Sequence, residues 1–369
     1  MRSFRRDAPV SDEIDLASNV VSLELPVPSV AMLQRAGEML VSGTYATGAG
    51  MERHRAAGAA WIGRRTDPSR VFVTAGTQHA LLVALAAATK PGDTLLTESV
   101  TYHGAKAAAA LLQLRLEPLP LDRYGIEPDA LGRAVNDRAA RGRTAKVLYT
   151  IPSLQNPTAI VMPEKRRREI AAVAERHGLT IIEDDVTGFL LEKTPPPIAA
   201  FAPERTIFIT GLGKAMAPAM RIGYVVAPDA FMARVQSAHW ATVLFASPVM
   251  AEMATTWIED GTAAKIAHLK RAEIALRNAA ARRIIAHGSG DPRALHLWME
   301  VPPRWTGDSF AEEARRRKVR VASASSFAVG NEVPRAVRLS IGAPVSVAEL
   351  ETALHVLAEI DERVAESVV

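Results

Sequence analysis

The stretch that decides the fold, Ile209–Val225, reads ITGLGKAMAPAMRIGYV. It begins within an apolar segment, Thr206–Thr210, which ends in Gly-Leu-Gly and a single lysine, Lys214. An arginine, Arg221, follows seven residues later, and the next segment, Gly223–Ala227, is again apolar. The pattern predicts two strands joined by a turn that carries one amine and one guanidinium. Most isolated lysines after a strand are surface charges, so the role of Lys214 depends on the rest of the chain.

The composition is that of an ordinary soluble globular protein. The chain has 369 residues, of which 48% are hydrophobic and 23% charged, enough for a large core and two subdomains. It has no cysteine, which excludes disulfides and cysteine nucleophiles and fits a cytoplasmic location. No apolar run has the length of a membrane span, and the charged N-terminal segment lacks a secretion signal. The net charge of +4 is spread out, so nucleic-acid binding is not expected.

Apolar runs alternate with alanine-rich helical stretches over the first two thirds of the chain. This alternation predicts an α/β fold with a parallel sheet. The expected strands are Val71–Thr74, Thr94–Thr97, Lys146–Thr150, Thr180–Asp184, Thr206–Thr210 and Gly223–Ala227, and the expected helices are Gln78–Lys90, Gly104–Leu114, Pro163–His177 and Asp229–Gln236. After Ser247 the pattern predicts a smaller α+β domain, with a long helical stretch Pro248–Ala286, strands Ala294–Val301 and Ala336–Ile341, and helices Asp308–Arg317 and Val345–Val364.

Polar side chains gather after the expected strands. Ligands of open α/β sheets bind beyond the carboxyl ends of the strands. These ends supply a helix N-terminus with hydroxyls, an aromatic ring, an amide, a carboxylate and an amine, in the order Gly76-Thr77-Gln78, Tyr102, Asn156, Asp184 and Lys214. Such a set can hold an aromatic phosphate ester and form an imine with it.

In this order of motifs the chain resembles fold-type I pyridoxal-phosphate enzymes of the class I/II aminotransferase family. The aminoadipate/kynurenine aminotransferases and the aminotransferase-like domain of MocR-type regulators are the most similar subgroups. The family writes Ser-x-Ser-Lys-x-x-x-Pro-Gly-x-Arg-x-Gly-Tyr where this chain has Gly211-Leu-Gly-Lys214-Ala-Met-Ala-Pro-Ala-Met-Arg221-Ile-Gly-Tyr224. The resemblance implies an aspartate-aminotransferase-like fold. It divides the chain into an N-terminal arm with part of the small domain (1–44), a large cofactor-binding domain (45–265) and a small C-terminal domain (266–369).

The resemblance implies roles for the residues around the cofactor. Lys214 would form the aldimine with pyridoxal phosphate and shuttle a proton. Asp184 would face the pyridine nitrogen; its neighbour Asp185 is the alternative, because successive strand residues point to opposite faces. Arg221 would bind the phosphate as a fork, together with backbone N–H groups of Gly76, Thr77 and Gln78.

Further roles concern the ring and the substrate. Tyr102 would stack on the ring, and Asn156 would donate to its phenolic oxygen. Tyr45 would reach the phosphate in a partner subunit. Arg338 would bind the substrate carboxylate, with Asn156 and Asn19 also expected to contact the substrate. No metal site is expected.

The sequence also departs from the family pattern. The usual tyrosine two or three residues after Asp184 is replaced by Val186 and Thr187, and both serines before the lysine are glycines, Gly211 and Gly213. These changes remove hydroxyls from the site and indicate a specialised branch. A serine restored at Gly211 is expected to strengthen phosphate binding, if the backbone tolerates it.

Together these features predict a cytoplasmic, homodimeric aminotransferase with shared active sites that acts on an amino acid and a 2-oxo acid. One alternative is another reaction at Cα, by an oxidase, a decarboxylase or a lyase. A second alternative is a non-catalytic module that senses the cofactor or another ligand, as in the MocR-type regulators. Their winged helix would need a further N-terminal segment, whereas about forty residues precede Tyr45.

Overall fold

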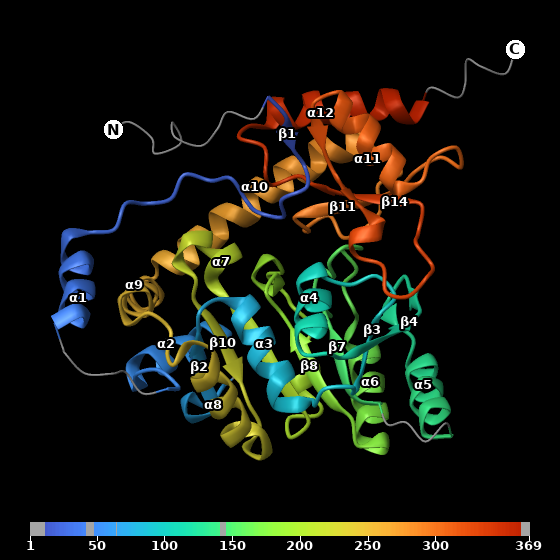
Figure 1. Ribbon diagram of the computed structural model, residues 1–369. Coiled ribbons are helices and arrows are strands. Elements are labelled where there is room, and N and C mark those ends of the chain that lie inside the picture. Colours follow the sequence, from blue (N-terminus) through green and yellow to red (C-terminus); the bar gives the residue numbers. More distant parts are fainter. Residues whose placement is uncertain (1–11, 42–47, 64, 141–144, 363–369) are drawn as a thin grey trace, which may run out of the picture.

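A seven-stranded sheet forms the centre of the molecule in a computed structural model, which describes residues 12–41, 48–63, 65–140 and 145–362 (Figure 1). Its strand order is β2-β10-β9-β8-β7-β3-β4. The strands are β2 (Val71–Thr74), β3 (Thr94–Glu98), β4 (Arg115–Leu119), β7 (Ala145–Thr150), β8 (Thr180–Asp184), β9 (Thr206–Gly211) and β10 (Gly223–Val226). β10 runs opposite to the other six strands, which are parallel to one another, so the predicted α/β class is confirmed and the sheet is mostly parallel.

Helices cover both faces of this sheet. The helices α3 (Thr77–Ala88), α4 (His103–Leu111) and α8 (Asp229–Val243) share one apolar cluster with the strands. On the other face, α5 (Pro128–Ala140) and α6 (Glu164–His177) share a second cluster. Because both faces of the sheet are covered, every residue of β2, β3 and β9 is buried, including polar ones such as Thr74 and Glu98.

A second layer lies beyond the carboxyl ends of the strands (Figure 1). It contains a three-stranded sheet of order β11-β14-β13, helices α11 and α12, and an apolar cluster of its own. The strand β1 pairs with β12, so the N-terminal segment belongs to this layer. These elements are β1 (Ile14–Asp15), β11 (His296–Glu300), β12 (Val319–Arg320), β13 (Ala322–Ser323), β14 (Ala336–Ser340), α11 (Gly307–Arg316) and α12 (Val347–Glu362). The domain boundaries at residues 45 and 266 stay a prediction.

The predicted helical stretch 248–286 is two helices. The helices α9 (Pro248–Glu259) and α10 (Thr262–Ile284) are separated at Gly261, whose φ of +79° is left-handed and ends the helical path. Elements not predicted from the sequence include the short strands β1, β12 and β13, the helices α1 (Val30–Val41), α2 (Glu52–Ile62) and α5, the strand β4, and the small hairpin β5 (Leu121–Asp122) and β6 (Gly125–Ile126).

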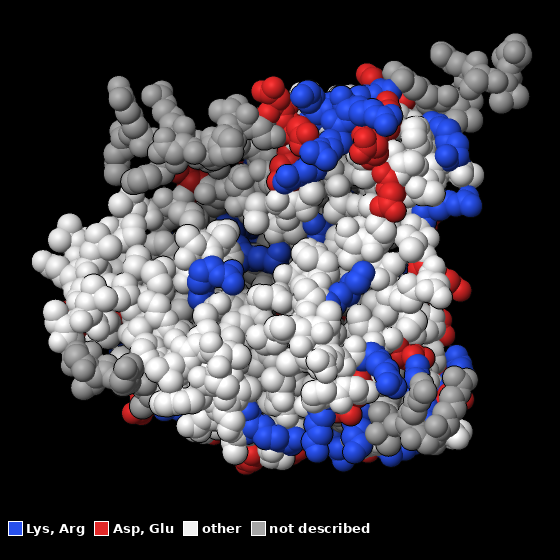
Figure 2. Space-filling model, viewed as in Figure 1, with Lys and Arg blue, Asp and Glu red and all other residues white. Residues whose placement is uncertain are grey.

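The surface in the view of Figure 2 is mostly uncharged across its middle. Charges of both signs lie above and below, and basic side chains interrupt the middle where the two layers meet. Within the described residues, no helix combines the length and the apolar character that crossing a membrane requires.

Candidate active site

A cavity of about 210 Å³ lies where the carboxyl ends of the strands meet the N-terminal segment. The predicted site residues that line it are Asn19, Gly76, Thr77, Gln78, Tyr102, Asn156, Asp184, Lys214 and Arg221. Arg338 does not line this cavity but contacts Asn156 from behind. Tyr45 lies outside the described residues. The structure therefore brings together side chains that are up to about 200 residues apart in the sequence.

Lys214 lies on the one-turn helix α7 (Leu212–Ala215), directly after β9. Its Nζ donates a hydrogen bond of 2.8 Å to the backbone oxygen of Asn19. Burial, together with the positive charge of Arg338, lowers the pKa of the Lys214 amine to about 8. A larger fraction of this amine is therefore neutral and nucleophilic at neutral pH than for an exposed lysine.

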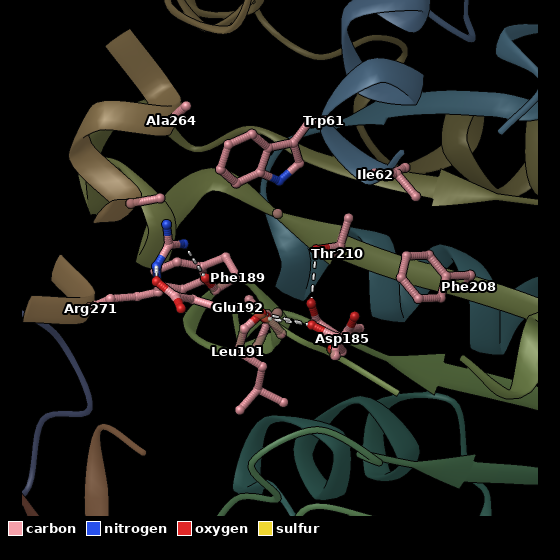
Figure 3. A pocket seen from close by; sticks show the side chains of 15 residues that line it. Trp61, Ile62, Asp185, Phe189, Leu191, Glu192, Phe208, Thr210, Ala264 and Arg271 are labelled. Atoms are coloured by element: carbon pink, nitrogen blue, oxygen red, sulfur yellow. Dashed lines mark hydrogen bonds and ion pairs between the residues drawn. The ribbon is translucent and has the colours of Figure 1, made fainter. Parts of the chain in front are cut away.

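Asp184 is the last residue of β8 and is buried. Burial raises the pKa of its carboxyl to about 6, and a hydrogen bond of 2.9 Å from the Tyr149 hydroxyl acts in the opposite direction. Asp185 does not share this cavity: it lines a second one, together with Trp61 and Phe208 (Figure 3). The alternation of strand residues therefore leaves Asp184 as the carboxylate that faces Lys214's cavity.

Arg221 and the N-terminus of α3 meet at one end of the cavity. Gly76 precedes α3 with a φ of +87°, and a Cβ added to it would lie 2.9 Å from Nη2 of Arg221. The guanidinium thus lies against the glycine backbone, which only a residue without a side chain permits. Free N–H groups at a helix start, next to a guanidinium, form a site for a phosphate-like anion.

At Gly211, where the family has its first serine, the hydroxyl of Thr77 occupies the space that a side chain would take. A Cβ added to Gly211 would lie 2.1 Å from Oγ1 of Thr77, whereas one added to Gly213 meets nothing closer than the Cα of Pro218, at 3.9 Å. A serine at Gly211 would displace Thr77, so the gain in phosphate binding that the sequence analysis expects is not supported. The Thr77 hydroxyl, at the start of α3, occupies the place where the family has its serine.

Asn156 and Arg338 form the other end of the site. Arg338, on β14, is 2% exposed and donates a 2.7 Å hydrogen bond to Oδ1 of Asn156 and another to the backbone oxygen of Ala17. Since this contact uses the amide oxygen, the NH₂ group of Asn156 is left to donate into the cavity. Burial lowers the pKa of the Arg338 guanidinium to about 10, at which it is still charged at neutral pH.

Three buried residues that hold the site in place were missed by the sequence analysis. Tyr149 orients Asp184. Lys270 donates to the backbone oxygens of Lys214 and Met216, at the end of α7. His296 lies 3.1 Å from the backbone oxygen of Gln155 and 3.3 Å from the side chain of Asn19. None of them belongs to a motif, and only the tyrosine in an apolar strand could have drawn attention as a buried polar group.

Val186 and Thr187, which stand where the family has a tyrosine, do not supply a hydroxyl to the cavity in its place. Val186 lines the cavity with an apolar side chain. Thr187 also lines it, but its hydroxyl donates a 2.8 Å hydrogen bond to the backbone oxygen of Ser153. Asn156 is therefore the nearest candidate donor for a ligand at this wall.

We expect Tyr149→Phe to raise the pKa of Asp184, because the hydrogen bond that stabilises its ionised form is lost. If turnover needs the ionised carboxylate, its loss on the acid side of the pH profile should then occur at a higher pH than in the parent. The pH dependence of turnover, measured for both proteins, checks this. Tyr224→Phe is the matched control, because Tyr224 is equally buried but lies on β10, away from Asp184. An unmoved acid limb in Tyr149→Phe contradicts the assignment.

Comparison with known proteins gives a family, relatives and structural neighbours. Residues 11–357 match the sequence profile of the family "Aminotransferase class I and II". The uncharacterized HTH-type transcriptional regulator YdeF of Bacillus subtilis is 32% identical over 80% of this chain, and the match covers 63% of YdeF. Aromatic-amino-acid aminotransferase 1 of Thermococcus litoralis is 29% identical over 71% of this chain and 65% of its own length. The chain thus spans less than two thirds of these relatives.

Solved structures share the fold over nearly the whole chain. An archaeal alanine:glyoxylate aminotransferase superposes with a TM-score of 0.86 at 24% identity, covering 98% of this chain and 92% of the other. The kynurenine aminotransferase of Pyrococcus horikoshii gives a TM-score of 0.86 at 22% identity, covering 96% of this chain and 92% of the other. The predicted aspartate-aminotransferase-like fold is confirmed, since the aspartate aminotransferase of Thermus thermophilus also superposes, with a TM-score of 0.83.

Proposed function

Because the chain belongs to the class I and II aminotransferase family, we propose that it is a pyridoxal-phosphate-dependent aminotransferase that moves an amino group from an amino acid to a 2-oxo acid. The observation that carries the proposal is the single cavity in which Lys214, Asp184 and Arg221 meet the start of α3. An amine, a buried carboxylate and an anion site are the groups that this cofactor requires.

The residues present fit the cofactor. The guanidinium of Arg221, resting on Gly76, and the N–H groups of Thr77 and Gln78 would hold its phosphate. Asp184 would hold a proton on the pyridine nitrogen, and Tyr102 would pack on the ring. When bound, the cofactor supplies an electrophilic carbon for exchange of amines and a ring that withdraws electrons from the substrate Cα.

Proton transfer would be the task of Lys214. With a pKa of about 8, its amine accepts and releases a proton near neutral pH. The backbone oxygen of Asn19 holds this amine in the cavity. At the other end, the Asn156 amide and the charge of Arg338 behind it would orient the substrate carboxylate. Direct contact with Arg338 requires Asn156 to move aside, because Asn156 and Ala17 now take up hydrogen bonds of the guanidinium.

Two other functions use the same site. Oxidation, decarboxylation or elimination at Cα would use the same amine and carboxylate. A ligand-sensing module is favoured by a specific observation, since YdeF and other relatives are HTH-type regulators. The absence of the tyrosine hydroxyl near Val186 fits either alternative as well as a specialised aminotransferase.

Incubation of the purified protein with pyridoxal phosphate and a panel of amino acids separates these functions. Transamination converts the cofactor to its amine form and releases a 2-oxo acid. Consumption of dioxygen or release of carbon dioxide instead indicates oxidation or decarboxylation. Binding of the cofactor without conversion of any amino acid indicates sensing and contradicts the proposal.

We expect Arg221→Lys to weaken binding of pyridoxal phosphate by about tenfold or more, because lysine keeps the charge but loses the two-pronged contact. A hydrogen bond to a charged group contributes about 1.5–3 kcal/mol, and about 1.4 kcal/mol is a factor of ten in affinity. Equilibrium titration of both proteins measures the change. Lys193→Arg, an exposed position outside the cavity, is the control. Equal affinities for parent and Arg221→Lys would remove Arg221 from the phosphate site.

The protein would act as a cytoplasmic homodimer in which Tyr45 completes the partner's site. Apolar side chains that remain exposed in the single chain support a partner: Val30, Leu33, Leu40 and Val41 on α1, and Trp240 on α8. Analytical ultracentrifugation should give a dimer at micromolar concentration, and Tyr45→Phe should weaken retention of the cofactor. A fully active monomer is the contrary outcome.

A further inference from the structure

A second cavity, of about 410 Å³, lies next to the candidate active site and shares only Val186 with it among the residues that line the two (Figure 3). Its walls come from α2, the loop after β8, the end of β9 and α10. Figure 3 shows Trp61 projecting into it from one side and Asp185 from the other, with Arg271 and Glu192 at one end. Cavities of this size take small organic molecules.

The walls are aromatic. Trp61, Phe189 and Phe208 all line the space, and Ile62 and Leu191 add aliphatic surface. An aromatic face attracts a cation through its negative π surface, most strongly when the ring is that of tryptophan.

Of the charged side chains that line the cavity, Arg271 and Glu192 pair with each other, and Asp185 is left. Arg271 donates a 2.8 Å hydrogen bond to the backbone oxygen of Phe189 and pairs with Glu192 at 3.9 Å. Within the described part of the chain, the carboxylate of Asp185 has no hydrogen-bond or ion-pair partner, and its Oδ1 is buried. A partly buried charge without a partner is costly, so a cation that enters the cavity is stabilised there.

We propose that this cavity is a binding site for a small organic cation, an ammonium group with an apolar or aromatic body, held by Asp185 and Trp61. The site adjoins the cofactor cavity across Val186, and its existence does not depend on transamination. Asp185 and Asp184 are consecutive, so one strand end presents one carboxylate to each cavity.

Occupation of this site would act on the neighbouring carboxylate. Among the described residues, the titratable groups that act on Asp184 include Tyr149 from β7, Tyr102 before α4, Lys214 from α7 and Asp185 itself. Burial is the main cause of the raised pKa of Asp184, and the charge of Asp185 adds to it. Hydrogen bonds from Tyr149 and the Val186 backbone and the charge of Lys214 lower this pKa. A cation beside Asp185 offsets the smaller contribution of Asp185, so the pKa of Asp184 falls and its carboxyl stays ionised to a lower pH.

Calorimetric titration of the pyridoxal-phosphate-loaded protein with benzyltrimethylammonium tests the site. This probe has no N–H group, so it cannot react with the cofactor at Lys214. We expect one molecule to bind per chain, and binding to weaken by about tenfold in Asp185→Asn, which removes the coulombic attraction, and by about threefold or more in Trp61→Leu. Asp260→Asn, a carboxylate at the end of α9, is the matched control and should bind as the parent does.

Loss of binding must be separated from loss of structure. Asp185→Asn removes an unpaired charge of the same shape, so its midpoint of thermal unfolding should not fall. Weakened binding in this stable variant supports the site. No saturable binding to the parent, or equal affinity in parent and Asp185→Asn, overturns the proposal. Neither result bears on the aminotransferase function, which the amino-acid panel tests by itself.

Discussion

Lys214→Ala is expected to lower transamination by roughly 10³-fold or more while the fold stays intact. The variant loses both the nucleophilic amine and the group placed to move the proton, and a positioned general base alone contributes about 10²–10⁴-fold. Within the described residues, the amine donates only to the backbone oxygen of Asn19, and Asp184 keeps its hydrogen bond from Tyr149 when the amine is removed. Steady-state kinetics and circular dichroism measure the two parts of this expectation.

The control for this variant is Lys193→Ala, which removes an exposed lysine outside the cavity. Its turnover should match that of the parent. If Lys214→Ala keeps more than about a tenth of the parent's turnover with native circular dichroism, another group carries the reaction and the assignment is wrong.

Asp184→Asn should lower turnover by roughly 10²-fold, because the amide cannot hold a proton on the pyridine nitrogen as a carboxylate does. The estimate follows from a charged hydrogen bond of about 1.5–3 kcal/mol. The pH profile gives a second readout. The pKa of Asp184 is raised to about 6, so the parent has an ionised carboxylate above this pH and loses activity as the pH falls through it.

In Asp184→Asn the side chain at this position no longer titrates, so the acid-side loss of turnover near pH 6 should disappear from the pH profile. The matched comparison is Tyr149→Phe, in which the limb persists but moves to higher pH. A limb near pH 6 that is unchanged in Asp184→Asn would show that another group titrates there.

Much of the fold could be predicted because its strands are apolar on both faces. The strands that begin at Val71 and Thr206 are buried at every residue, and the strand that begins at Thr180 is buried from its second residue onward. The direction of β10 could not be predicted, since a short apolar strand reads alike in either direction. The strand β4 was missed because its edge position leaves Arg115, Glu117 and Pro118 in a strand with mixed burial. The break at Gly261 has a sequence signal, since Asp-Gly after a helical run is typical of a turn.

The residues of the site, too, include some that could be predicted from the sequence and some that could not. Residues at strand ends, such as Lys214 and Asp184, could be predicted because a parallel sheet collects them at one edge. Tyr149 and His296 could not be, because they act through contacts between segments far apart in the sequence. The loss of serine at Gly211 was visible, but its filling by the Thr77 hydroxyl depends on the packing of α3 against β9.

The central claim, that the cavity at the strand ends binds pyridoxal phosphate through Lys214, has one direct measurement. The purified protein is incubated with the cofactor and reduced with borohydride, and its tryptic peptides are analysed by mass spectrometry. The account predicts that the added mass lies on Lys214, in the peptide between Arg205 and Arg221. Labelling of Lys270, of Lys106 or of no lysine at all would contradict it.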